Sequence, residues 1–152
     1  GGDTQLTNMY AAYEDLSAET KARIDPMKVI HKYHSSRKLS RISTRPAEEM
    51  AAMPEATHPL VRTHPETGRK SLYLNPNRME QIVGLDRAAS DRLLDELIAH
   101  ATQPKYEYRH VWRPGDIVIW DNRCTMHKAN ADYPEGERRL MHRVIVAGTE
   151  PF

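Results

Sequence analysis

The chain has 152 residues, with 22 basic and 21 acidic side chains and a formal net charge of +1. This length fits one domain, and so balanced a charge argues against nucleic acid or a membrane surface as the partner. No run of about 18 apolar residues occurs, so we expect no membrane-spanning helix. The one cysteine, Cys124, cannot form an internal disulfide and fits a reducing, cytoplasmic environment.

The first part of the chain predicts short helices. Apolar side chains recur at helical spacing over residues 7–16, and Thr7 or Asn8 can cap that helix. Ser17 is typical of the cap of a second helix over 18–24, which ends at Asp25-Pro26 because a residue before proline is pushed out of helical geometry. Helix is predicted to resume over 27–33.

The segment 34–69 has no clear hydrophobic period, and prolines recur along it. We expect a long loop inside a single domain that covers residues 1–152. Loops of this length in a compact domain are usually functional lids or mobile segments. Two interpretations stay open: a solvated connection, or a lid whose basic side chains form a rim over an active site.

Strands and helices alternate in the next part. Residues 71–74 predict a short strand, and residues 77–83 predict one or two helical turns. Ser90 can cap a longer helix that continues to Thr102. The apolar stripe of that helix, typical of a helix packed on a sheet, consists of Leu93, Leu94, Leu97 and Ile98.

The C-terminal third reads as strands. Residues 106–112 alternate between polar and apolar, and residues 113–116, Arg-Pro-Gly-Asp, predict a tight turn. Residues 117–120 form a continuous apolar run, typical of a strand buried on both faces. A final strand is predicted over 139–147.

His127, Arg139 and Arg143 are candidate functional side chains at this end. His127 follows the apolar run and an Asp-Asn turn, a position from which side chains reach a site. In a strand, Arg139 and Arg143 share one face about 13 Å apart, and the guanidinium fork binds carboxylates through paired hydrogen bonds. A structural histidine and an exposed strand face with two solvated charges remain the alternatives.

Several groups of residues resemble the taurine dioxygenase family of iron(II)- and 2-oxoglutarate-dependent oxygenases. They cover nearly the whole chain and are Gly1-Gly2-Asp3-Thr4, Asn8 to Glu14, His58 to Gly68, Trp120-Asp121-Asn122-Arg123 with His127, Asn130 to Pro134, and Arg138 to Arg143.

The resemblance implies a fold and a site. The fold would be mainly β with flanking helices (α+β), a double-stranded β-helix or jelly roll. His127 would be the distal iron(II) ligand, and Thr4 and Arg139 would bind the far carboxylate of the cosubstrate 2-oxoglutarate. Arg143 would meet the anionic group of a small, taurine-like sulfonate or carboxylate substrate, which the enzyme would hydroxylate with dioxygen.

The two remaining ligands of a two-histidine, one-carboxylate iron site would come from a His-x-Asp motif, which we expect just before Gly1. His64-Pro65-Glu66 has a similar form, but it lies downstream of the motif's place, and we do not expect it to bind metal. We therefore expect a barrel that is incomplete at its N-terminus and inactive alone. Its unpaired sheet edges would favour association, for example as a homo-oligomer.

Two other classes of function stay open. One is a non-catalytic barrel remnant that acts as a binding or interaction module. The other is an ordinary β-rich domain in which His127 and the arginines are structural.

Overall fold

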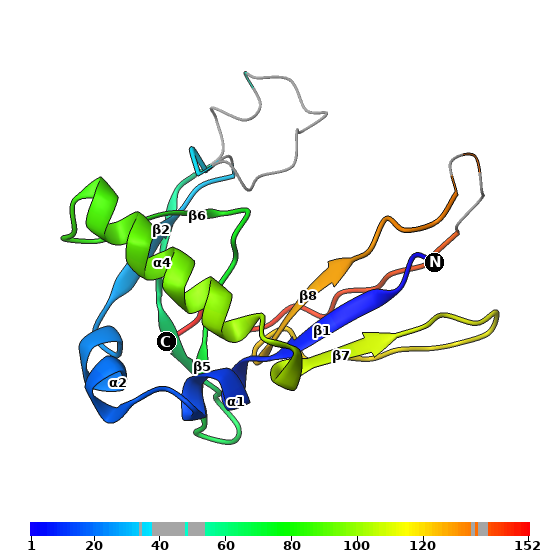
Figure 1. The fold of residues 1–152 in the computed structure, drawn as a ribbon, viewed down its shortest axis with the longest axis horizontal. Helices are drawn as coiled ribbons and strands as arrows, with labels where there is room; N and C mark the ends of the chain where they lie inside the picture. Colours follow the sequence, from blue (N-terminus) through cyan, green and yellow to red (C-terminus); the bar gives the residue numbers. More distant parts are fainter. Residues whose placement is uncertain (34, 38–47, 49–53, 135, 137–139) are drawn as a thin grey trace.

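The structure is a computed structural model that describes residues 1–33, 35–37, 48, 54–134, 136 and 140–152. The described part is mainly β with few helices. It contains two three-stranded sheets and a two-stranded ribbon, and helix α4 lies across one of the sheets (Figure 1).

The first sheet joins the two ends of the chain. Strand β1 (Thr4–Asn8) lies between β7 (Glu107–His110) and β8 (Thr125–Ala129), and both pairings are antiparallel. Residues near the N-terminus therefore pair directly with residues more than 100 positions later.

Two short helices follow β1, and both confirm their predictions. Helix α1 (Met9–Glu14) begins at Asn8, whose side chain accepts hydrogen bonds from two backbone N–H groups. Helix α2 (Ala18–Ile24) begins at Ser17, whose hydroxyl oxygen accepts from the Thr20 N–H at 3.1 Å. These caps satisfy N–H groups that no helical turn can reach.

The second sheet corrects two helix predictions. Strand β2 (Lys28–His31) replaces the helix expected over 27–33, and β6 (Met79–Ile82) replaces the helical turns expected over 77–83. Strand β2 lies between β6 and β3 (Ala56–Pro59). Val29 and Ile82 are opposite one another and fully buried, and β-branched side chains suit this pleated packing.

The expected loop over 34–69 contains regular structure in its described part. Besides β3, strand β4 (Val61–Thr63) pairs with β5 (Lys70–Leu72). The expectation of a loop without strands is therefore wrong for this part. Part of the proposed lid, residues 34, 38–47 and 49–53, lies outside the described residues.

Helix α4 (Arg87–Ala101) confirms the longest predicted helix but begins earlier. Asp86, not Ser90, is its cap, because the Asp86 carboxylate accepts from the Ala89 N–H at 2.9 Å. Ser90 is instead fully buried, and its hydroxyl accepts from the Ile82 N–H at 2.8 Å. The helix buries its apolar stripe in one core that also includes Met9, Ala12, Ile24, Val29, Leu60, Leu72, Met79 and Ile82.

The C-terminal part departs most from prediction. The tight turn over 113–116 is confirmed, with a hydrogen bond from the Asp116 N–H to the Arg113 carbonyl at 3.1 Å. Residues 117–120 and 140–147, however, are not strands. Ile117 and Ile119 are 87% and 91% exposed, because no described element covers them. The expectation of a strand buried on both faces is therefore wrong for this structure.

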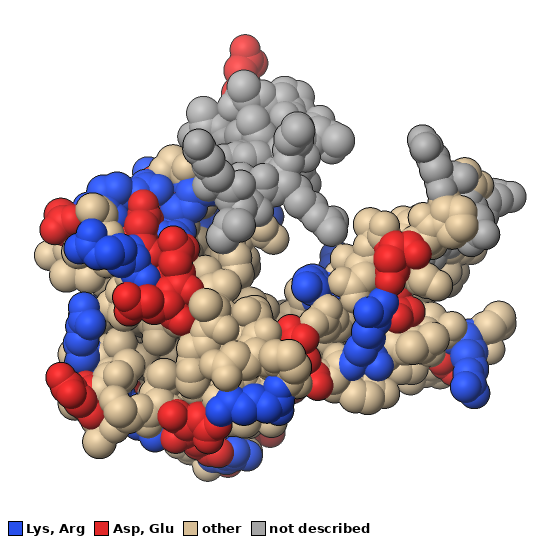
Figure 2. Space-filling model, viewed as in Figure 1, with Lys and Arg blue, Asp and Glu red and all other residues tan. Residues whose placement is uncertain are grey.

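Charges are interspersed on the surface. Figure 2 shows Lys and Arg side chains beside Asp and Glu side chains on the visible face, as in the ion pairs Arg87–Asp91 and Lys105–Asp15. Within the described ranges, no helix is long and apolar enough to span a membrane.

Candidate active site

Thr4 and His127 lie on one face of the first sheet. Leu6 is directly opposite His127, and Thr4 is opposite Ala129. Opposite residues of an antiparallel pair point to the same face, as do residues two apart on one strand. The sheet therefore brings the residue expected to bind 2-oxoglutarate and the residue expected to bind iron to neighbouring positions on one surface.

Trp112 orients the hydroxyl of Thr4. Thr4 is 6% exposed, and the indole N–H of Trp112 donates to its Oγ1 at 2.9 Å. An indole N–H can only donate, so the Thr4 oxygen must accept. The hydroxyl hydrogen of Thr4 is then left to donate to another acceptor, which a carboxylate group can supply.

Trp112 was not among the predicted site residues, although the sequence contains a signal for it. The period of two over residues 106–112 places His110 and Trp112 on one face, and their rings meet edge to face at 4.6 Å between centroids. His110 is opposite Thr4. Only the pairing of β7 with β1 brings that face next to Thr4, and the local sequence does not reveal this pairing.

His127 is held in a form suited to metal binding. Its ring lies 5.0 Å from the ring of Trp120, between centroids. Partial burial lowers the pKa of His127, and the positive charge of Arg143 lowers it further. The imidazole is therefore mostly neutral near pH 7, which is the protonation state that binds metal ions.

Arg143 acts electrostatically on His127, as the effect on the histidine pKa shows. Its side chain is exposed and lies in the segment 140–147, which carries no strand. The strand expected to carry Arg143 is therefore not formed over residues 140–147. Arg139 lies outside the described residues.

A charged clamp joins the N-terminal motif to residues 130–132. Asp3 is buried and accepts from Arg109 Nε at 2.7 Å, and Arg109 also pairs with Asp132. The Asp132 carboxylate in turn accepts from the Gly2 N–H at 2.7 Å. A Cβ on Gly1 would lie 2.5 Å from the Asp132 carbonyl oxygen, so glycine is required for this approach.

His64 belongs to a hydrogen-bonded network. Its Nδ1 accepts from the N–H groups of Glu66 and Thr67, at 3.2 and 3.3 Å. Its Nε2 must then carry the proton and donate to Asp121, 3.2 Å away. Both ring nitrogens are engaged, and Glu66 is paired with Arg123.

Asp121 organises the turn that precedes β8. Its carboxylate accepts from the backbone and side chain of Arg123, which lowers the pKa of Asp121 well below its usual value. Its carbonyl oxygen accepts from the Thr125 hydroxyl at 2.6 Å, at the first residue of β8. The His64–Asp121 contact therefore connects the β4–β5 ribbon to the strand that carries His127.

Within the described part of the chain, no group of three or more His, Cys, Asp or Glu side chains could hold a metal ion. His127 fits one position of an iron ligand set, and these residues do not complete the set. No catalytic step through a metal follows from the described residues alone.

Comparisons with known proteins identify the family of this chain. The family described as "Taurine catabolism dioxygenase TauD, TfdA family" matches residues 1–145. The chain is 40% identical over 154 residues to (S)-phenoxypropionate/alpha-ketoglutarate-dioxygenase of Sphingobium herbicidovorans, covering 97% of this chain and 53% of that protein. It is 38% identical over 148 residues to the alpha-ketoglutarate-dependent 2,4-dichlorophenoxyacetate dioxygenase of Burkholderia sp. (strain RASC), covering 97% and 49%.

Solved structures show the same similarity in three dimensions. The structure of AAD-2 in complex with Mn(II) and N-oxalylglycine superposes with a TM-score of 0.89 and 40% identity, over 99% of this chain and 59% of that chain. A taurine dioxygenase from Burkholderia xenovorans gives a TM-score of 0.71 and 39% identity, over 85% and 40%. The chain spans about half the length of the curated relatives it matches. From the family match and these identities, the chain belongs to the TauD, TfdA family of dioxygenases.

Proposed function

We propose that these residues carry part of the active site of an iron(II)- and 2-oxoglutarate-dependent oxygenase with a jelly-roll fold. His127 supplies one iron ligand, Thr4 and Arg139 bind the far carboxylate of 2-oxoglutarate, and Arg143 binds the anionic group of the substrate. When bound, iron(II) activates dioxygen for hydroxylation, with 2-oxoglutarate as cosubstrate. The residues of this chain bind and orient the reactants.

The observation that carries this proposal is the shared face of Thr4 and His127 on neighbouring strands. Two further observations support it. Trp112 leaves the Thr4 hydroxyl hydrogen directed to an acceptor, and the environment of His127 favours its neutral form.

The proposed substrate is a small organic carboxylate or sulfonate. Arg143 supplies the positive charge, and a guanidinium binds either oxyanion through paired hydrogen bonds. The names of the relatives support this class, since 2,4-dichlorophenoxyacetate and (S)-phenoxypropionate are carboxylates and another relative is named as a sulfonate dioxygenase.

The 152-residue chain alone is proposed to be inactive, because its described residues do not complete an iron site. We expect no oxygen uptake when it is mixed with iron(II), 2-oxoglutarate and candidate carboxylates or sulfonates. Robust turnover would overturn this part of the proposal. If the natural protein that contains the chain also fails to turn over but binds the same anions, the alternative of a non-catalytic binding module is correct.

The role of Thr4 is tested separately by binding. In the natural protein loaded with Mn(II), Thr4→Val should weaken 2-oxoglutarate binding about 10-fold or more, since a hydrogen bond to a charged group contributes roughly 1.5–3 kcal/mol. Thr57→Val, on an exposed position of β3, is the matched control. Equal affinities of Thr4→Val and wild type for 2-oxoglutarate would show that Thr4 does not bind it.

A further inference from the structure

A second cluster of polar side chains is built from strands outside the first sheet. It consists of His31 on β2, His58 on β3, Arg62 on β4 and Tyr73, which follows β5. We call it the Arg62 cluster. The rings of His31 and His58 meet edge to face at 5.0 Å, and each lies within 6 Å of the Tyr73 ring. The Arg62 guanidinium lies over that ring at 5.6 Å from its centroid.

Three nitrogen atoms of this cluster are buried without a hydrogen-bond partner. Arg62 Nε, His31 Nε2 and His58 Nδ1 are buried and make no hydrogen bond, and they are three of the five such side-chain atoms in the described part of the chain. Buried polar atoms are almost always hydrogen-bonded, and leaving one unpaired costs about 1–3 kcal/mol, more for a charged group. Three at one place therefore require an explanation.

Arg37 is a second buried arginine in the same fold; its Nε is also without a hydrogen bond, but its guanidinium has counter-charges. Arg37 and Arg62 are each 6% exposed. The Arg37 guanidinium pairs with the carboxylates of Asp91 and Asp95 on α4. Arg62 makes no hydrogen bond or ion pair with any described residue, and it rests only against the face of Tyr73. A buried guanidinium without a counter-charge is strongly unfavourable.

We propose that the Arg62 cluster binds a carboxylate or a similar small oxyanion. The Arg62 fork would donate to the anion, and the unpartnered ring nitrogens of His31 and His58, as N–H tautomers, would donate to its remaining lone pairs. One anion would then give partners to all three orphan nitrogens. This proposal does not depend on the function assigned to His127, Thr4 or Arg143.

The pKa of His31 should respond to an anion bound in the cluster. Burial, followed by the neighbouring His58, lowers the pKa of His31 to about 4. An anion beside His31 would oppose both effects, because an opposite charge favours the protonated ring. A bound anion is therefore expected to raise the pKa of His31 and to shift the NMR signal of its ring.

The test is an NMR titration of the 152-residue chain with sodium acetate, at ionic strength held constant with sodium chloride. The ring Hε1 signals of His31 and His58 should shift saturably, while those of His100, which bonds the Ala12 carbonyl elsewhere, should not. Absence of a saturable shift with acetate, and then with phosphate, would overturn the proposal.

Two variants make the test specific. Arg62→Met should weaken acetate binding at least tenfold. It should not itself destabilise the chain, since it removes an unpaired buried charge. Arg69→Met changes an exposed arginine in the same ribbon that pairs with Glu14, and should leave the titration unchanged. If Arg62→Met retained the wild-type affinity, the cluster would not be the site.

The anion has two possible sources, a free small carboxylate or an Asp or Glu side chain of polypeptide outside these residues. The same titration of the natural protein that contains the chain distinguishes them. A saturable acetate response there identifies a free ligand. Signals already at the acetate-bound positions, with no further response, identify a side-chain carboxylate.

Discussion

The chemistry of single side chains in this protein depends on one or two neighbours each. The Thr4 hydroxyl gains its direction from Trp112, which follows β7 and donates to it at 2.9 Å. His31 owes its lowered pKa to burial and His58. Two predictions follow directly from these local contacts.

Trp112→Phe should weaken 2-oxoglutarate binding about 2- to 10-fold in the natural protein, because a neutral hydrogen bond contributes roughly 0.5–1.5 kcal/mol and its loss frees the Thr4 hydroxyl to rotate. Trp120→Phe removes an indole N–H that donates to Asn122 instead, and should change the affinity less than twofold. Calorimetry with Mn(II) and 2-oxoglutarate measures both. An unchanged affinity for Trp112→Phe would contradict the orienting role.

The lowered pKa of His31 predicts a pH-dependent stability in chloride buffer. The folded pKa, about 4, lies below the unfolded value near 6.5, so the unfolded chain binds more protons between these values. The free energy of unfolding should therefore fall as pH decreases from about 6.5 to about 4, by roughly 1–2 kcal/mol after solvent screening.

Urea unfolding at several pH values measures this effect. His31→Gln should flatten the profile over that interval, while His142→Gln, at an exposed position, serves as the matched control. The same slope in His31→Gln and wild type would assign the pH dependence to another group.

At the scale of elements, contacts between distant segments position the strands. Strand β1 follows the Gly1-Gly2-Asp3 segment that the Arg109 and Asp132 clamp holds. Strand β8 follows the Asp121 turn, which His64 holds from the ribbon of β4 and β5. The face shared by Thr4 and His127 thus depends on residues that lie outside the proposed ligand-binding positions.

His64→Ala should lower the free energy of unfolding by about 1–3 kcal/mol, since it removes one donor to Asp121 and leaves two backbone N–H groups without their acceptor. Urea unfolding measures the loss. In the wild type, ¹⁵N NMR should show the His64 ring in the tautomer that is protonated at Nε2. A proton on Nδ1 would contradict the network, because the Glu66 and Thr67 N–H groups donate to that atom.

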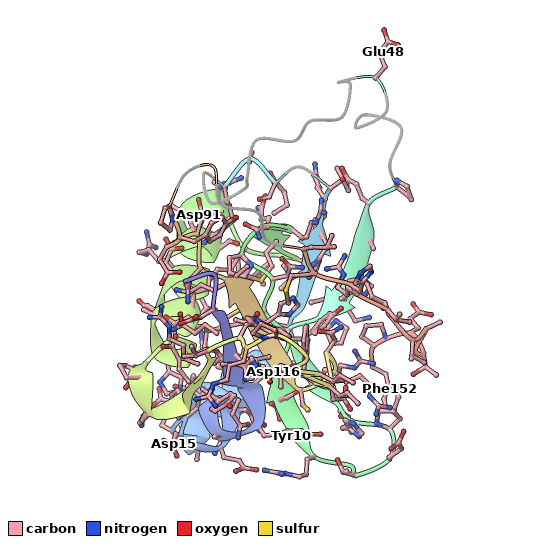
Figure 3. All side chains as sticks on the ribbon, turned by 90° about the vertical axis from the view of Figure 1, so that its right-hand side faces the viewer. Tyr10, Asp15, Glu48, Asp91, Asp116 and Phe152 are labelled. Atoms are coloured by element: carbon pink, nitrogen blue, oxygen red, sulfur yellow. The ribbon has the colours of Figure 1, made fainter. Side chains whose placement is uncertain are left out.

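At the scale of the whole molecule, the described chain has one well-packed part and one exposed part. Helix α4, with β2, β5 and β6, encloses the core, whereas the first sheet extends away from it (Figure 1). The last residues return to the ribbon, where the Thr63 N–H donates to the Phe152 carbonyl at 2.7 Å (Figure 3). Large apolar side chains of the C-terminal part stay exposed, including Ile117, Ile119, Leu140, Val144 and Val146.

This exposed apolar surface predicts self-association of the chain on its own. The double variant Ile117→Lys and Ile119→Lys should raise the monomer fraction in analytical ultracentrifugation. Its stability should change by no more than about 0.5 kcal/mol, as expected for surface positions. Thr57→Lys, at another exposed position, is the control. Equal association of all three proteins would show that this surface is not the contact.

Local patterns predicted the helices well and the strands poorly. Asn8 and Ser17 mark helix starts through hydrogen bonds to residues two or three positions away, so the sequence contains the whole signal. Val29 lies in a strand because Ile82 and His58 pair with it. No window of sequence around residue 29 contains those partners, and the local spacing of apolar residues wrongly favoured a helix.

The residues of the candidate site also fall into two groups, those that local motifs indicated and those that they did not. The roles of His127, Thr4 and Arg139 were inferred from motifs and remain predictions, and Arg139 also lies outside the described residues. Trp112, the Asp3–Arg109–Asp132 clamp and the Arg62 cluster were not predicted, since each joins segments far apart in the chain.

The sequence by itself determined the family, the helix caps and the residue types that bind anions and metals, because motifs and caps are local. Only the tertiary structure decided that Thr4 and His127 share one face and that Trp112 orients Thr4. It alone showed that Arg37 is paired while Arg62 is not. The physical reason is that strand pairing and burial depend on contacts between distant segments, and these set each side chain's partners, charge state and access to ligand.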